Sequence, residues 1–280
     1  MPIFTILGGV VMNWGRIRAI IRKDLREVGA NRMALIPMII VPVLMCVIVP
    51  GAITAIVLTA GPDSLSNAAS LEQVIPYYPV PAAITNQVQR LLYVILNYTF
   101  VPFFMIVPLM LATIVSANAV VGEKERGTLE TLLYTPITNR ELATGKLLAA
   151  FLPAASISFG VFIIYFIVLN VLGYALAGVI LVRSLIWIPV ILLLAPAVSL
   201  LGLAVTLQVS FKAKSFTEAQ QIAAVVVIPI VGLVLVQVTG VVIFNALYVI
   251  LAALALGGLA YFLLTRVISR FNREKIISTL

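Results

Sequence analysis

Residues 91–121 read LLYVILNYTFVPFFMIVPLMLATIVSANAVV, and none of these 31 side chains carries a charge. A soluble domain carries about 25% charged residues, whereas this 280-residue chain is 10% charged and 62% apolar. An uncharged stretch can satisfy its backbone in lipid only as a helix or in a closed barrel. Because it lacks the short alternating segments of barrel strands, the stretch predicts a membrane-spanning helix.

The same pattern recurs along the chain. A helix needs about 20 apolar residues to cross a hydrocarbon core of roughly 30 Å. Six stretches meet this length, at 33–60, 91–121, 147–172, 184–210, 220–240 and 244–265. The chain is therefore predicted to be an all-α integral membrane protein, with residues 1–280 forming one domain of six transmembrane helices. Prolines in several spans predict kinks, because each removes a backbone donor.

The basic residues are distributed unequally between the two sides that six spans would define. Of the 18 lysines and arginines, only Arg90 and Arg183 fall on the side opposite the termini. The positive-inside rule then places both termini in the cytoplasm and the protein in the cytoplasmic (inner) membrane. The net charge of +8 indicates orientation and contact with anionic lipids. A nucleic-acid partner is not expected, because no soluble basic domain is present.

Residues 14–32 predict an amphipathic helix before the first span. Its apolar residues recur at spacings of three, four and seven, which places them on one helical face. They are Trp14, Ile17, Ile20, Ile21, Leu25 and Val28. Arg18, Arg22, Lys23 and Arg26 fall between them, so the helix is expected in the membrane interface, with basic groups toward lipid phosphate. It is either a simple anchor or an elbow helix that also contacts a partner.

The chain carries no energy source of its own. Ion-coupled carriers usually keep a carboxylate within a span, but all ten acids lie outside the predicted spans. They are Asp24, Glu27, Asp63, Glu72, Glu123, Glu125, Glu130, Glu141, Glu218 and Glu274. The phosphate-binding pattern G-x-x-x-x-G-K-[ST] is missing, and the spans hold no catalytic or metal-binding cluster. We expect no catalytic residue, bound cofactor or metal, and a pump of this kind would receive its work from another subunit.

An island of charge follows the second span. Residues 122–146, GEKERGTLETLLYTPITNRELATGK, hold four acids and four bases. Leu129, Leu132 and Leu133 fall on one face of a short helix, which Pro136 ends. Thr138 and Glu141 have the spacing of a capping box for the third span. The leucine face with its charged rim suits docking onto a soluble protein, although a solvated loop resting its leucines on lipid fits the pattern as well.

The run EKERGTLETLL from Glu123 to Leu133, followed by Pro136, Glu141 and Gly145-Lys146, resembles the signature of ABC exporter permeases of the second type. Their fold is also called type V, and the likeness is to members without a large extracytoplasmic domain. The resemblance implies an elbow helix containing Trp14, Arg18, Ile21, Arg22 and Leu25. It also implies an ATPase-coupling region containing Glu123, Glu125, Arg126, Gly127, Thr128, Leu129, Glu130, Leu132, Leu133, Pro136, Glu141 and Lys146. Gly127 would permit a close approach or a bend.

The resemblance implies partners as well. Two permease subunits, identical or related, would pair among the membrane lipids. Each would dock on a separate ATP-binding cassette subunit that holds ATP and Mg and drives alternating access. Without charge along the spans, an amphipathic or lipid-like substrate is expected, and possible pathway residues are Asn97, Asn118, Gln208 and Gln237. The residues alone leave two alternatives: a membrane scaffold or assembly factor without transport, and an ion-coupled secondary carrier.

Overall fold

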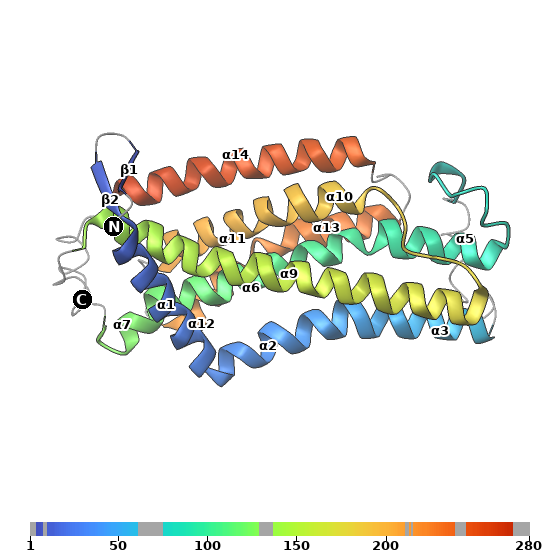
Figure 1. Ribbon diagram of the computed structural model, residues 1–280, viewed down its shortest axis with the longest axis horizontal. Helices are drawn as coiled ribbons and strands as arrows, with labels where there is room; N and C mark the ends of the chain where they lie inside the picture. The colour runs from blue at the N-terminus through green and yellow to red at the C-terminus, as the bar shows by residue number, and fades with distance from the viewer. Residues whose placement is uncertain are drawn as a thin grey trace.

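The computed structural model describes residues 4–7, 10–60, 75–128, 137–210, 213, 215–238 and 245–270. These residues form an elongated bundle of helices that run along its length (Figure 1). An antiparallel hairpin of β1 (Phe4–Leu7) and β2 (Val10–Asn13) precedes α1 (Trp14–Ala30). The all-α class is thus confirmed for the described residues, apart from this hairpin, which the sequence did not predict.

Five helical segments in the described part of the chain are long and apolar enough to cross a membrane, at 35–59, 87–125, 140–177, 187–210 and 246–267. The first segment consists of α2 (Arg32–Val43), η1 (Leu44–Ile48) and α3 (Val49–Ala60), and the second of α5 (Gln87–Val94), η4 (Ile95–Thr99), α6 (Val101–Ala117), η5 (Asn118–Gly122) and α7 (Glu123–Glu125). The third is the single helix α9 (Asn139–Ala177). The fourth consists of α10 (Trp187–Pro189), η6 (Val190–Leu194) and α11 (Ala195–Ser210), and the fifth is α14 (Ala246–Arg270). A short 3₁₀ turn, η3 (Ile75–Tyr77), precedes α5. The predicted span 220–240 falls on two shorter helices, α12 (Phe216–Ala224) and α13 (Val227–Val238).

Among the π-helical turns η1, η4, η5 and η6, three are followed within three residues by a proline. A proline ring clashes with the carbonyl four residues earlier and cannot donate to it. The residues four before Pro50, Pro102 and Pro196 lie within η1, η4 and η6, respectively. The widened turns therefore accommodate the proline rings. The turn η5 has no such proline and leads directly into α7.

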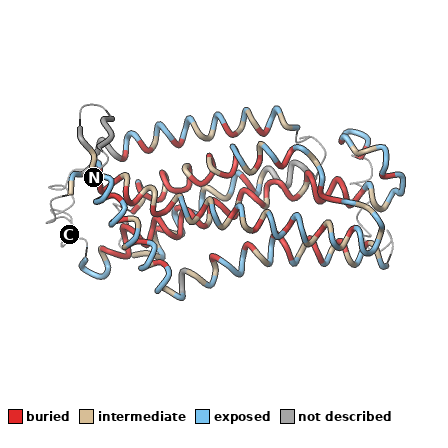
Figure 2. The backbone as a smooth tube through the Cα atoms, in the orientation of Figure 1, coloured by how far each residue is buried: buried red, intermediate tan, exposed pale blue. Residues whose placement is uncertain are grey.

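The core runs along α6 and α11, which are buried over most of their surface, whereas α14 and the α2–α3 helix expose much of theirs (Figure 2). α6 and α11 pack closely because Gly202 has no side chain. A Cβ atom there would lie 2.5 Å from Leu109 Cδ1 and 3.2 Å from the Leu109 carbonyl oxygen. Farther along, the rings of Phe104, Tyr165 and Trp187 pack edge to face or tilted against one another, with centroids 4.8–5.3 Å apart. In a bilayer, the exposed apolar faces of the outer helices are available to lipid.

Candidate functional site

The first helix packs across one end of the bundle, beside α9 (Figure 1). The Asn13 side chain caps it by accepting a hydrogen bond from the Gly15 amide, at 2.9 Å. Its apolar residues, which the sequence placed on one face, form two groups. Ile17, Ile20 and Val28 are buried, whereas Trp14 and Leu25 remain 42% and 38% exposed. The buried face also holds one acid, Asp24.

Glu123, at the start of α7, is fully buried and binds two lysines from different helices. Lys146 of α9 donates from Nζ to Glu123 Oε2 at 2.6 Å, and also to the carbonyl oxygen of Ala119. Lys23 of α1 donates to Glu123 Oε1. Burial lowers the pKa of Lys23, but its hydrogen bond to Glu123 and the charge of Glu123 outweigh this effect, so the pKa lies above its ordinary value. One carboxylate thus links three helices.

Asp24 is buried beside this pair but makes poorer contacts. Its nearest bases are Lys23, at 3.6 Å, and Lys146, at 3.9 Å. Neither carboxylate oxygen has a hydrogen-bond partner. Burial raises the pKa of Asp24 above its ordinary value, although the charge of Lys146 opposes this. Burial therefore opposes the charged form of Asp24, and no hydrogen bond to its carboxylate offsets this effect.

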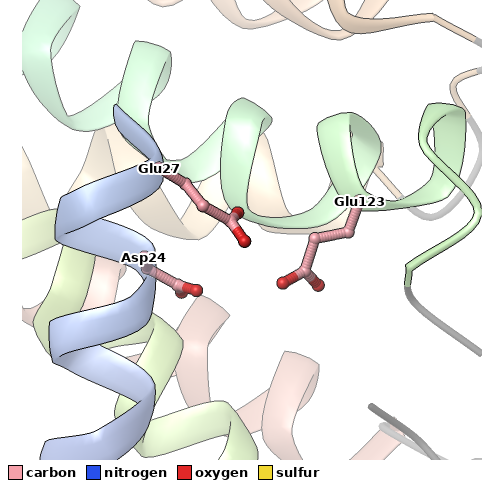
Figure 3. Close-up of side chains that lie close together, drawn as sticks. All are labelled: Asp24, Glu27 and Glu123. Atoms are coloured by element: carbon pink, nitrogen blue, oxygen red, sulfur yellow. The ribbon is translucent and has the colours of Figure 1, made fainter. Parts of the chain in front are cut away.

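Two further charges complete what we call the ion-pair cluster: Lys23, Asp24, Glu27, Glu123, Arg126 and Lys146. Glu27 accepts from Lys23 at 3.1 Å and from Arg126 at 3.3 Å. The carboxylates of Asp24, Glu27 and Glu123 turn toward one another (Figure 3), with oxygens within 4.8 Å. A divalent cation could use such oxygens, but the ammonium groups of Lys23 and Lys146 already lie among them. With three acids and three bases, the site has the chemistry of an ion-pair network.

A second set of hydrogen bonds joins the start of α1 to the start of α9. Thr138 and Glu141 form the predicted capping box, with the Glu141 amide donating to Thr138 Oγ1 at 3.2 Å and Glu141 Oε2 accepting from the Thr138 amide at 2.9 Å. The other oxygen of Glu141 accepts from the Asn13 amide at 2.8 Å. One turn later, Gly145 permits close packing, because a Cβ atom there would lie 2.9 Å from Ile20. The Gly145-Lys146 pair therefore combines a close approach with an ion pair.

A family model described as "ABC-2 family transporter protein" matches residues 18–265, which is most of the chain. This chain belongs to the ABC-2 transporter family. The resemblance is thereby confirmed at the level of an ABC-2 type permease, and the chain is a multi-pass permease component of an ABC transporter. Permeases of this family pair with an ATP-binding cassette subunit. No curated protein matches the chain.

In this permease the predicted coupling region is partly described. Glu125, Arg126, Gly127 and Thr128 are exposed, whereas Leu129, Glu130, Leu132, Leu133 and Pro136 lie outside the described residues. Gly127 has a φ of 66° and open space around its Cβ position, so it supplies a bend rather than a close approach. Glu125 Oε1 accepts from the Phe216 amide at 2.9 Å, at the start of α12. The segment therefore also contacts α12.

Sequence reasoning missed the partners that α1 supplies to the permease's ion-pair cluster. It placed Asp24 and Glu27 only as acids outside the spans, and Lys23 among lipid-facing bases. One signal was available, because Asp24 falls in register with Ile17, Ile20 and Val28, at spacings of three and four. An acid in register with the apolar face indicates a buried partner. The identity of that partner could not be read locally, because Lys146, the nearest base from another helix, lies more than 100 residues further along the chain.

The four possible pathway residues of the permease have different surroundings. Asn97 is buried, donates to the carbonyls of Tyr93 and Leu181 at 2.9 and 2.8 Å, and accepts from the Ser184 amide at 3.0 Å. Asn118 is buried within η5, and Gln208 is exposed on α11. The Gln237 side chain lies outside the described part of the chain. Asn97 has its amide group fully engaged in joining the second span to the loop after α9.

Proposed function

We propose that this permease exports an amphipathic or lipid-like substrate by alternating access, driven by an ATPase subunit docked on residues 122–146. The observation that carries the proposal is the position of Glu123, which is bonded to Lys23 of α1 and Lys146 of α9 directly before the exposed residues 125–128. A displacement of the exposed segment by the ATPase therefore moves Glu123 and, through its ion pairs, the helices that carry Lys23 and Lys146.

The contacts suggest how this displacement spreads. Arg126 binds Glu27 on α1, and Glu125 binds the Phe216 amide on α12. Glu141 joins the caps of α1 and α9. Displacement of residues 123–128 therefore acts on helices leading to the first, third and fifth predicted spans. For ATP binding to shift the permease between states, the contacts with the ATPase must differ between those states.

The exposed segment offers the ATPase a polar rim, and the predicted leucine face of Leu129, Leu132 and Leu133 supplies its apolar centre. ATP and Mg are held by the ATPase subunit. Glu123 and Lys146 are buried, so in this proposal they act inside the permease and do not touch the partner.

We further propose six crossings, with α12 and α13 together forming the fifth. In support, α12 begins at the same end of the bundle as α7, and α14 runs back toward that end (Figure 1). An even number of crossings puts that end, with most of the basic residues, on the cytoplasmic side of the inner membrane. A second permease subunit, identical or related, pairs with this one in the membrane.

The proposed substrate class is inferred from the polar side chains of the described spans. Several hydroxyls of the described spans bond back to their own helices: Thr54 to Pro50, Ser158 to Ala154, Ser199 to Ala195 and Thr206 to Gly202. No acid lies in the middle of a described span. Surfaces of this kind favour a substrate with a large apolar part over a small multivalent ion.

The test is to co-express the permease with its ATPase and to measure co-purification, ATPase stimulation and transport of a fluorescent phospholipid into inside-out vesicles. Leu132→Asp and Glu125→Lys should each weaken co-purification or uncouple ATP hydrolysis from transport. Arg90→Glu reverses a charge at the opposite end and should behave as wild type. Glu125→Gln keeps an acceptor for the Phe216 amide, so it separates the effect of reversing the charge from the effect of losing this hydrogen bond. Full coupling in both Leu132→Asp and Glu125→Lys would overturn docking at this segment.

A further inference from the structure

The outward side of α1 carries arginines that the ion-pair cluster does not use. Arg18, Arg22 and Arg26 recur every four residues, so they form one stripe of about 12 Å along the helix. All three are exposed, and no ion pair involves them among the described residues. The two acids of α1, Asp24 and Glu27, are turned inward toward Glu123 (Figure 3). The stripe is therefore purely basic.

An apolar edge runs beside this stripe. Trp14 and Leu25 are 42% and 38% exposed, and Ile21 between them is half-buried. On a helix with 3.6 residues per turn, these three residues adjoin the arginine stripe and lie away from Lys23. An apolar edge directly beside a basic stripe is the pattern of a helix that lies in the membrane interface. A bilayer interface takes both, because Trp and Leu enter the acyl boundary while arginines reach phosphate.

We propose that the Arg18–Arg22–Arg26 stripe binds the headgroups of anionic phospholipids in the leaflet on its side of the membrane. The position of α1 agrees with this, because the helix crosses the end of the bundle directly before the first long apolar helix (Figure 1). Lys23 and Arg16 do not belong to the site, since Lys23 binds Glu123 and Glu27, and Arg16 binds Glu141. The lipid then holds the outer face of the helix whose inner face meets Glu123.

Trp14 provides a local probe. The chain has two tryptophans, and the Trp187 indole nitrogen has no hydrogen-bond partner, so Trp187→Phe leaves Trp14 alone without breaking a hydrogen bond. The full-length Trp187→Phe permease is reconstituted in phosphatidylcholine bilayers containing a minor fraction of brominated phosphatidylglycerol or brominated phosphatidylcholine. The quenching of Trp14 fluorescence reports how strongly each brominated lipid is enriched near α1. Native mass spectrometry of the permease with intact Trp187 counts the bound phosphatidylglycerol molecules.

Brominated phosphatidylglycerol should quench Trp14 at lower mole fractions than brominated phosphatidylcholine, with each arginine contributing about fivefold to the preference. The pair Arg22→Gln/Arg26→Gln should remove most of it, whereas the charge-matched control Arg90→Gln/Arg183→Gln, at the opposite end, should keep it. About 1 M salt should weaken the preference for brominated phosphatidylglycerol, because salt screens the attraction between the arginines and the lipid phosphates. Equal quenching by both lipids, or a preference unchanged by the arginine pair, would overturn the proposal. Loss of ATPase co-purification with unchanged lipid preference would assign the stripe to a protein partner instead.

Discussion

The two ends of the bundle both bury polar groups, but they satisfy them differently. At the α1 end, the ion-pair cluster brings together three acids and three bases from α1, from α7 and the residue after it, and from α9. At the opposite end, Asn97 and Asn170 bind backbone groups of the loop after α9 through uncharged hydrogen bonds of 2.8–3.0 Å. One end is held by charges and the other by aligned amides.

The difference has a physical consequence for motion. Attraction between charges falls slowly with separation, whereas an amide hydrogen bond weakens steeply once its distance and angle are lost. An ion-pair cluster therefore tolerates small shifts between helices, and the Asn97 bonds hold one geometry. The cluster lies where the proposed displacement by the ATPase is applied, so the end that must move has the adaptable contacts. Removing a single charge, however, leaves its partners buried and uncompensated.

The largest effect is expected from Glu123→Gln. This change leaves the buried Lys146 without its closest acid, and the free energy of unfolding should fall by about 3 kcal/mol, as for other broken buried pairs. Titration with sodium dodecyl sulfate in mixed micelles measures the loss. Adding Lys146→Met should recover part of it, whereas Glu125→Gln on the exposed side should change little. A loss no greater than that of Glu125→Gln would contradict the ion-pair cluster.

Asn97→Leu tests the other end. It leaves the Leu181 carbonyl and the Ser184 amide without this partner, which should cost about 2 kcal/mol because unsatisfied buried groups are expensive. The loss should not vary with salt or with pH between about 5 and 8, because no charge is involved. Gln208→Leu, at an exposed amide, serves as the control and should be close to neutral. A strong pH dependence of the Asn97 effect would remove the contrast between the ends.

Gly145→Ala asks whether the charged end also depends on close packing. The added Cβ atom would lie 2.9 Å from Ile20, so α1 should shift from α9 and the free energy of unfolding should fall by about 1–2 kcal/mol. Gly160→Ala in the same helix has no atom within 4 Å of the new Cβ atom and should be neutral or slightly stabilising. Equal melting temperatures for the two variants would show that α1 does not rest on Gly145.

The smallest effect is expected from Asp24→Asn, and it depends on pH. Burial raises the pKa of Asp24, so its protonated form is favoured by folding. Its contribution to stability is full below the unfolded pKa and is lost as pH rises through the folded pKa. The stability of Asp24→Asn minus that of wild type should therefore increase from acid toward neutral pH. A difference that instead decreases would mean that Lys146 and Lys23 outweigh burial.

Much of the architecture could be predicted locally. Long apolar stretches predicted the helices, and the Thr138–Glu141 spacing predicted a capping box that the structure confirms. Periodicity also predicted the helix over residues 14–32, found as α1 and the start of α2. The hairpin was missed because its four-residue strands carry little signal. Whether 220–240 is one span could not be decided from composition, because hydropathy does not register the break between α12 and α13.

Local patterns were enough to predict a membrane protein made of helices and a concentration of charge at residues 122–146, because hydrophobicity and motif spacing are properties of neighbours along the chain. Which charges meet depends instead on contacts between segments that are distant in the sequence. Lys23 turns inward to Glu123 while Arg22, one residue earlier, faces outward. That choice follows from the packing of α1 on Gly145 of α9, a contact between segments more than 100 residues apart.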